Sequence, residues 1–319
     1  MTEKKFYKCD YMDSGINFER NGVYVCCKTA HEGGGLLTLS DSYDNLNWKD
    51  IFTKKRKWTE ETKKGHPPNN CKGCSSLVET TEPYNEDAFV FVDVNSFVNC
   101  NSRCCYCDCW SVKNFNENSL YPVFKELLDK NLLKNSPHGY IQFAGGEPAL
   151  MKDFEKITDL CLKKGLERYI VNSNGIKFSK GIYNLLKQAK TNLFVSLDSG
   201  CKETYEKIKN VPCFNQVVEN LKKYVSAEQE GKSAVWLKYI IIPEYNDNFE
   251  EIEKWYKLAT EKIGVKAVVL DVEREWFISH NRKITPKTEK LIEYIKAKCE
   301  EDNVRLDYYE QLKCLYGIH

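Results

Sequence analysis

The sequence lacks an excess of either charge and lacks long apolar runs. Its 319 residues carry 47 Lys and Arg against 46 Asp and Glu, so a net charge of +1 gives no electrostatic reason to expect a nucleic-acid partner. The longest apolar runs, near residues 240–242 and 268–270, are too short to span a bilayer. The charged first residues also lack the apolar segment of a signal peptide. We therefore expect a cytoplasmic protein without membrane association.

Histidine is scarce and cysteine is abundant. The 5 histidines do not supply the ligand set of a catalytic zinc site, whereas there are 15 cysteines, clustered most densely between Cys100 and Cys109. In a reducing compartment, clustered thiols more often bind metal or carry out redox chemistry than form disulfides. Others are expected to be small buried apolar residues.

From about residue 88 onward, short apolar runs alternate with segments of helical spacing. This alternation predicts an α/β fold with buried parallel strands, either an open doubly wound sheet or a barrel. Polar residues follow the strand ends, and that rim is the expected active-site face. The predicted strands cover residues 88–94, 139–143, 168–171, 193–197, 234–242 and 266–270, and the helices lie near 120–128, 154–165, 185–189, 214–225, 252–263 and after Thr285-Pro286.

Residues 1–87 differ from the rest, because they are rich in Gly, Asn, Lys and Thr and show little helical periodicity. We expect an irregular cysteine-rich region here that gains order from a bound metal, since metal ligation contributes folding free energy directly. The basic run at residues 54–57 favours a solvated helix face over a nucleic-acid site.

The strongest motif follows the first predicted strand. Cys100, Cys104 and Cys107 form C-x3-C-x2-C, and three thiolates on a tight loop suit three irons of a [4Fe-4S] cluster whose fourth iron stays open. A structural zinc site would instead use paired C-x2-C units. The sequence GGEP (residues 145–148) follows the second strand, where two glycines allow close backbone approach and Glu147 offers a carboxylate.

These two motifs together resemble the signature of the radical S-adenosylmethionine (radical SAM) superfamily, with Tyr106 at the aromatic position. The resemblance implies a partial (β/α)6 barrel in which SAM binds the open iron and is cleaved to a 5'-deoxyadenosyl radical that abstracts a hydrogen atom from the substrate. It implies cluster ligands at Cys100, Cys104 and Cys107, and contacts to SAM from Tyr106, Gly145, Gly146, Glu147, Asn174, Ser196 and Lys238.

A second set of cysteines lies in the N-terminal region. Cys9, Cys26 or Cys27, Cys71 and Cys74 resemble the first part of the SPASM or twitch auxiliary-cluster domains, although in that family these elements follow the barrel and here they precede it. The resemblance implies a second [4Fe-4S] cluster. A structural zinc with four thiolate ligands is the alternative, and spacing does not decide between Cys26 and Cys27.

The expected organisation is therefore an auxiliary metal region (residues 1–87), a radical SAM barrel (88–280) and a C-terminal helix and tail (281–319). The expected substrate is a peptide or protein side chain or backbone, with a flavodoxin- or ferredoxin-type electron donor. The alternatives are radical oxidation or epimerisation of a small polyol, sugar or amino sugar, and a non-catalytic iron-sulfur or zinc binding protein. No nucleic-acid partner is expected.

Overall fold

The computed structural model describes residues 6–26, 36–81, 88–95, 99–111 and 119–317, which divide into two compact units. The first unit draws its described residues from Met1–Val98, Asn114–Gly145 and Met151–Tyr169. The second draws them from Asn99–Lys113, Gly146–Leu150 and Ile170–His319. Each is described below by itself.

In the first unit, a parallel core of strands is extended by an antiparallel hairpin. β6 pairs in parallel with β2 and with β7, while β3 pairs antiparallel with β2 and β4, and β1 pairs antiparallel with β5. The strands are β1 (Phe6–Lys8), β2 (Gly15–Glu19), β3 (Gly22–Tyr24), β4 (Thr38–Ser40), β5 (Val78–Thr80), β6 (Phe91–Asn95) and β7 (Tyr140–Phe143). The helices are α1 (Asp10–Ser14), α3 (Trp48–Lys63), η1 (Asn69–Cys71), α4 (Tyr121–Asp129) and α5 (Phe154–Lys163).

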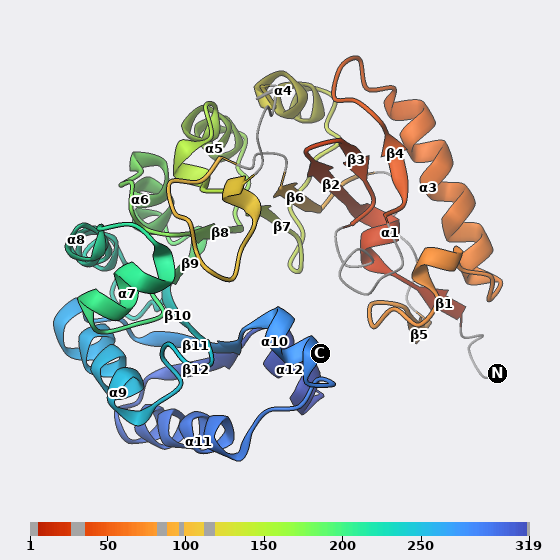
Figure 1. Ribbon diagram of the computed structural model, residues 1–319. Helices are drawn as coiled ribbons and strands as arrows, with labels where there is room; N and C mark the ends of the chain where they lie inside the picture. Colours follow the sequence, from red (N-terminus) through yellow and green to blue (C-terminus); the bar gives the residue numbers. More distant parts are fainter. Residues whose placement is uncertain (1–5, 27–35, 82–87, 96–98, 112–118, 318–319) are drawn as a thin grey trace. The chain divides into compact units, whose positions relative to one another are not determined.

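Helix α3 gives the N-terminal region more regular structure than its sequence pattern indicates (Figure 1). Asn47 caps the helix, its side chain accepting a hydrogen bond from the Asp50 amide. One face buries Trp48 and Phe52, whose rings contact that of Phe89 at centroid distances of 6.0 and 5.0 Å. The basic run at residues 54–57 lies on this helix, as expected, but Lys55 is buried with the apolar face.

In the second unit, consecutive strands are neighbours. β9 and β10, β10 and β11, and β11 and β12 pair in parallel. The elements are η2 (Cys109–Ser111), η3 (Pro148–Leu150), β8 (Tyr169–Ser173), α6 (Lys180–Lys187), β9 (Thr191–Ser196), α7 (Lys202–Lys209), α8 (Phe214–Val225), β10 (Val235–Ile241), α9 (Phe249–Lys257), the π-helix η4 (Leu258–Ile263), β11 (Ala267–Val272), α10 (Arg274–Ser279), α11 (Pro286–Glu301), β12 (Arg305–Tyr308) and α12 (Glu310–Tyr316).

The order of these strands resolves the choice between a doubly wound sheet and a barrel. Strands β8 to β12 stand side by side in chain order, without the reversal that defines a doubly wound sheet. Helices α6, α8, α9 and α11 all lie on one face of them (Figure 1). Sequential parallel strands with helices on the outer face are the arrangement of a partial barrel.

All six predicted strands and the predicted helices are confirmed, with small shifts at their ends. Thr285 caps α11 by accepting from the Thr288 amide, and Pro286 occupies the first turn, as expected. The N-cap position of α4 is Leu120, and the Ser119 hydroxyl accepts a hydrogen bond from the Tyr121 amide. Helix α7 and strand β12 were not predicted. Within the described residues, none of the helices has the length and apolar run needed to cross a membrane.

Candidate functional site: the cysteine loop and the carboxyl ends of the strands

The loop that carries the cysteine motif is held by the end of helix α7. The Arg103 amide donates to the Lys209 carbonyl at 3.0 Å, and the Cys105 amide donates to the Ile208 carbonyl at 2.9 Å. The Ser102 hydroxyl also donates to the Lys209 carbonyl, at 3.3 Å. Helix ends leave carbonyls without partners inside the helix, so α7 supplies the acceptors that fix the loop.

The first two motif thiols interact with each other and with neighbouring polar groups. Burial raises the pKa of Cys100, and the charge of Cys104 adds to the rise. The Asn174 amide nitrogen donates to the Cys100 sulfur at 3.5 Å, and the Ser102 hydroxyl lies 3.1 Å from the Cys104 sulfur. The hydrogen bond from Asn174 opposes the rise in the pKa of Cys100.

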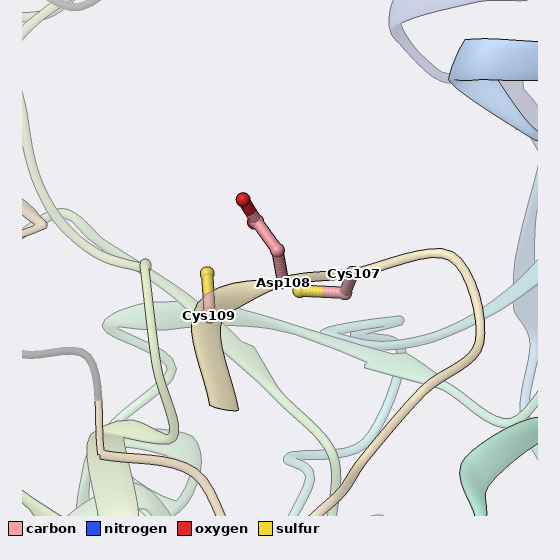
Figure 2. Close-up of side chains that lie close together, drawn as sticks. All are labelled: Cys107, Asp108 and Cys109. Atoms are coloured by element: carbon pink, nitrogen blue, oxygen red, sulfur yellow. The ribbon is translucent and has the colours of Figure 1, made fainter. Parts of the chain in front are cut away.

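Cys107 has a second thiol beside it that the sequence pattern did not single out. Figure 2 shows Cys107, Asp108 and Cys109 along the loop, and one ligand atom from each lies within 4.8 Å of the others. The hydrogen bond from Cys109 lowers the pKa of Cys107 to about 6, while the same bond raises the pKa of Cys109. The pKa of Cys107 therefore lies below the ordinary value of a thiol, whereas that of Cys100 lies above it.

Glu147 is 1 % exposed and binds the loops around it. Its Oε1 accepts from the Ala149 amide at 3.0 Å and the Ser173 hydroxyl at 2.8 Å, and its Oε2 accepts from the Asn174 amide at 2.6 Å. Burial raises the pKa of this carboxyl, and the three hydrogen bonds oppose the rise. The carboxylate thus joins the GGEP loop to the end of β8.

The other predicted SAM contacts lie within strands or just after them. Gly145 has a φ of 92°, a left-handed conformation that favours glycine, and Gly146 follows it. The Asn174 side chain donates to Asn101 Oδ1 at 2.8 Å, which ties the residue after β8 to the cysteine loop. Ser196 and Lys238 are register partners on β9 and β10. Lys238 Nζ lies 4.0 Å from Asp271 Oδ2 and 3.6 Å from the centroid of the Tyr309 ring.

Tyr106 belongs to a buried polar network. Its hydroxyl donates to Asp198 Oδ2 at 2.7 Å and accepts from Lys209 Nζ at 2.6 Å, and Lys209 also forms an ion pair with Asp198. The side chains of Asp198 and Lys209 are 0 % and 1 % exposed. The Tyr106 ring packs against an apolar cluster of Ile208, Ile240 and Ile242. Its expected contact with SAM stays a prediction.

In the first unit, the N-terminal cysteines come together through strand pairing. Cys9 follows β1 and Cys74 precedes β5, and these two strands pair with each other. Burial, together with the charges of neighbouring thiols such as Cys26, raises the pKa of Cys9 to about 11 and that of Cys71 to about 12. The described thiols are thus near enough to interact electrostatically. Cys27 lies outside the described residues.

Lys55 from α3 lies close to these thiols. Its ammonium donates to the Gly15 carbonyl at 2.7 Å and the Tyr11 carbonyl at 3.2 Å, and the residue is 2 % exposed. Burial lowers the pKa of Lys55 to about 7, while Asp13, Cys9 and Cys26 act in the opposite direction. Ionised thiols would therefore stabilise the charged lysine, and the lysine would stabilise them.

Comparison with known proteins agrees with this geometry. The family model described as "Radical SAM superfamily" matches residues 94–259. The chain belongs to the radical SAM superfamily. The matched segment begins in β6 and includes the cysteine loop, the GGEP loop and strands β7 to β10. The fold class implied by the motifs is therefore confirmed.

Curated relatives of this radical SAM protein include a probable GTP 3',8-cyclase from Saccharolobus islandicus, 28% identical over 54% of this chain and 53% of its own length. A GTP 3',8-cyclase from Haemophilus influenzae is 27% identical over 50% of this chain and 47% of its own. The chain thus spans about half the length of the curated relatives it matches. The solved structure of Streptococcus suis SuiB bound to precursor peptide SuiA is similar with a TM-score of 0.52 and 13% identity, over 84% of this chain and 54% of that one, and shows a shared fold.

The donor set suits the cofactors of a radical SAM enzyme. Such enzymes bind a [4Fe-4S] cluster and SAM, and the motif loop offers three partly exposed thiols, Cys100, Cys104 and Cys107. The pKa of Cys107 is lowered, and Cys100 accepts a hydrogen bond from the side-chain amide of Asn174. Thiolates supplied by one short loop are the donors that an iron-sulfur cluster requires.

Sequence reasoning missed the roles of Asp198, Lys209 and Lys55. Asp198 follows a strand at the expected rim, so its position was a usable signal. Lys209 lies in a lysine-rich segment and Lys55 in a basic run, and both patterns are typical of solvated surfaces. Their burial depends on non-local carboxylates and carbonyls.

Proposed function

We propose that this chain binds a [4Fe-4S] cluster through Cys100, Cys104 and Cys107 and uses SAM to abstract a hydrogen atom from a substrate. The observation that carries the proposal is the cysteine loop, fixed to α7 and tied by Asn174 to the end of β8. When bound and reduced, the cluster supplies the electron that cleaves SAM to methionine and a 5'-deoxyadenosyl radical.

The chain's own residues orient SAM at the carboxyl ends of the strands. The GGEP loop (Gly145, Gly146 and Glu147) faces the methionine amine in this proposal, because the backbone there leaves room and the buried carboxylate gives the loop negative charge. Asn174 follows β8, Ser196 ends β9 and Lys238 lies within β10 beside Ser196, and in this proposal they contact the carboxylate or ribose of SAM.

Anaerobic reconstitution followed by a SAM cleavage assay tests this function. The wild-type protein is expected to develop the broad visible absorption of an iron-sulfur cluster and to release 5'-deoxyadenosine with a strong reductant. Cys104→Ala is expected to lose that activity, whereas Cys105→Ala, which removes an adjacent exposed thiol outside the motif, is expected to keep it. Full cleavage by Cys104→Ala would refute the assignment.

We also propose a second [4Fe-4S] cluster at Cys9, Cys26, Cys71 and Cys74, with zinc as the alternative. A structural zinc with four thiolate ligands would use the same donors. The mutual electrostatic interaction of the thiols supports a shared ligand set.

Metal analysis of the reconstituted protein distinguishes the two centres. About eight irons per chain with little zinc are expected for two clusters, and Cys71→Ala is expected to retain about four. About four irons and one zinc in the wild-type protein would instead identify a zinc site. In the two-cluster protein, the N-terminal centre would relay electrons or accept one from the substrate radical.

The substrate class we propose is a peptide or protein, with a flavodoxin- or ferredoxin-type electron donor. SuiB, with which the chain shares its fold over 84% of its length, was solved with a precursor peptide, and this supports the choice. A nucleotide is the second candidate, because the curated relatives are GTP 3',8-cyclases. Incubation with GTP distinguishes the two candidates. If GTP stimulates release of 5'-deoxyadenosine and is itself converted, the substrate is a nucleotide and not a peptide.

A further inference from the structure

Beside the cysteine loop, the structure buries an ion pair that has no part in the proposed SAM contacts. Lys209 ends helix α7, and Asp198 follows β9 in a left-handed conformation with a φ of 58°. The Ile240 amide donates to Asp198 Oδ1 at 2.9 Å, and the Asn246 side chain donates to the Asp198 carbonyl at 2.7 Å. Asp198 is therefore held by hydrogen bonds from Ile240 and Asn246 as well as by its ion pair with Lys209.

The same lysine reaches the cysteine loop through both its backbone and its side chain. Its carbonyl accepts from Arg103 and Ser102, and its ammonium donates to the Tyr106 hydroxyl and lies 5.0 Å from the centre of the Tyr106 ring. Tyr106 lies between Cys104 and Cys107 in the sequence. The carbonyl and the ammonium of Lys209 therefore both hold the segment that carries these two proposed cluster ligands.

The charge of Lys209 also acts on the thiols. The ammonium interacts electrostatically with Cys104, Cys105 and Cys107. Lys209 and Asp198 are buried, so their charges are screened less than exposed charges would be. The potential of an iron-sulfur cluster depends on nearby charge and on burial, so a fixed cation beside the ligands favours the reduced cluster, which carries one more negative charge.

We propose that the buried Lys209–Asp198 pair, linked to the loop by Tyr106, positions the cysteine loop and sets the reduction potential of the cluster bound there. The inference rests on the proposed cluster at Cys100, Cys104 and Cys107. It assigns the pair a positioning role, in which Lys209 raises the potential and Asp198 limits the rise.

The two charges predict shifts of opposite sign. Lys209→Met removes the cation and leaves the carboxylate, so the midpoint potential is expected to fall. Asp198→Asn leaves the cation without its partner, so the potential is expected to rise. Lys209→Arg keeps the charge and is expected to restore a potential close to that of the wild type. A purely structural role would leave the potential unchanged or shift it in the same direction in both charge variants.

The experiment is a redox titration of anaerobically reconstituted protein followed by electron paramagnetic resonance. The signal that changes when SAM is added reports the loop cluster and separates it from any N-terminal centre. Opposite shifts in Lys209→Met and Asp198→Asn support the proposal, and shifts of the same sign, or none, overturn it. If Lys209→Met does not fold, the direction of the Asp198→Asn shift alone decides.

The positioning role is tested by Tyr106→Phe, which removes the hydroxyl and keeps the ion pair. Iron per chain is expected to fall relative to Tyr256→Phe, a matched variant that loses a buried hydroxyl bonded to Lys298 and Asp302, away from the loop. Equal iron in the two variants overturns this role. A wild-type protein that binds no SAM-responsive cluster would instead refute the proposed function itself, so the two failures are distinguishable.

Discussion

Replacing Glu147 with glutamine is expected to destabilise the second unit by about 2 kcal/mol at neutral pH. Both carboxylate oxygens accept hydrogen bonds, Oε1 from Ala149 and Ser173 and Oε2 from Asn174. A glutamine has one oxygen, so in its best orientation it keeps the first two bonds and turns an amide N–H₂ group toward the Asn174 amide. Leaving a buried donor without an acceptor costs about 1–3 kcal/mol.

Glu228→Gln is the matched control. The amides of Ala234 and Val235 both donate to the same oxygen of Glu228, so a glutamine in that position retains both acceptors. Its expected cost is below about 0.5 kcal/mol. Urea unfolding measures both variants, and SAM titration of the cluster-loaded proteins is expected to show weaker binding for Glu147→Gln alone. Equal unfolding midpoints for Glu147→Gln and the wild type would refute the reasoning from the hydrogen bonds.

Three further outcomes are expected. Gly200→Ala would place its Cβ 2.2 Å from the carbonyl carbon of Lys254, so its urea midpoint should fall by the equivalent of about 3 kcal/mol; an unchanged midpoint would contradict the close approach. Thr285→Ala removes the acceptor for the Thr288 amide and should cost about 1 kcal/mol by the same assay. Lys55→Met removes a buried cation beside Cys9 and Cys26, so a chelator should remove the metal proposed at these thiols faster than from the wild-type protein. Equal removal rates would show that Lys55 does not stabilise the thiolates.

The strands of the barrel were predictable because buried parallel strands consist of consecutive apolar residues. In β11, every residue from Ala267 to Val272 is buried, so the strand reads as a continuous apolar run. β12, by contrast, is four residues long and half-exposed, and only its pairing with β11 makes it a strand. Only a helix face at residues 54–57 was predicted for α3, and its full extent was not, because its apolar residues form a single stripe among charged residues.

The candidate site divides in the same way. The motif cysteines and GGEP are local patterns of residue type and spacing, so candidate site positions could be chosen there from the sequence. The pairing of Asp198 with Lys209 depends on where α7 ends relative to β9, and the burial of Lys55 depends on carbonyls 40 and 44 residues away. Charge alone does not reveal such contacts, since most lysines are solvated.

The position of the N-terminal thiols in the chain bears on the timing of assembly. Cys9, Cys26, Cys71 and Cys74 and the pairing strands β1 and β5 are complete by Thr80, before the ribosome has made β6. At about 5–20 residues per second, the 26 residues from Cys74 to Cys100 take about 1–5 seconds to synthesise, so the N-terminal thiols are made first. A nascent chain that loads this centre early would present β2 already oriented, ready to receive β6 as its parallel neighbour.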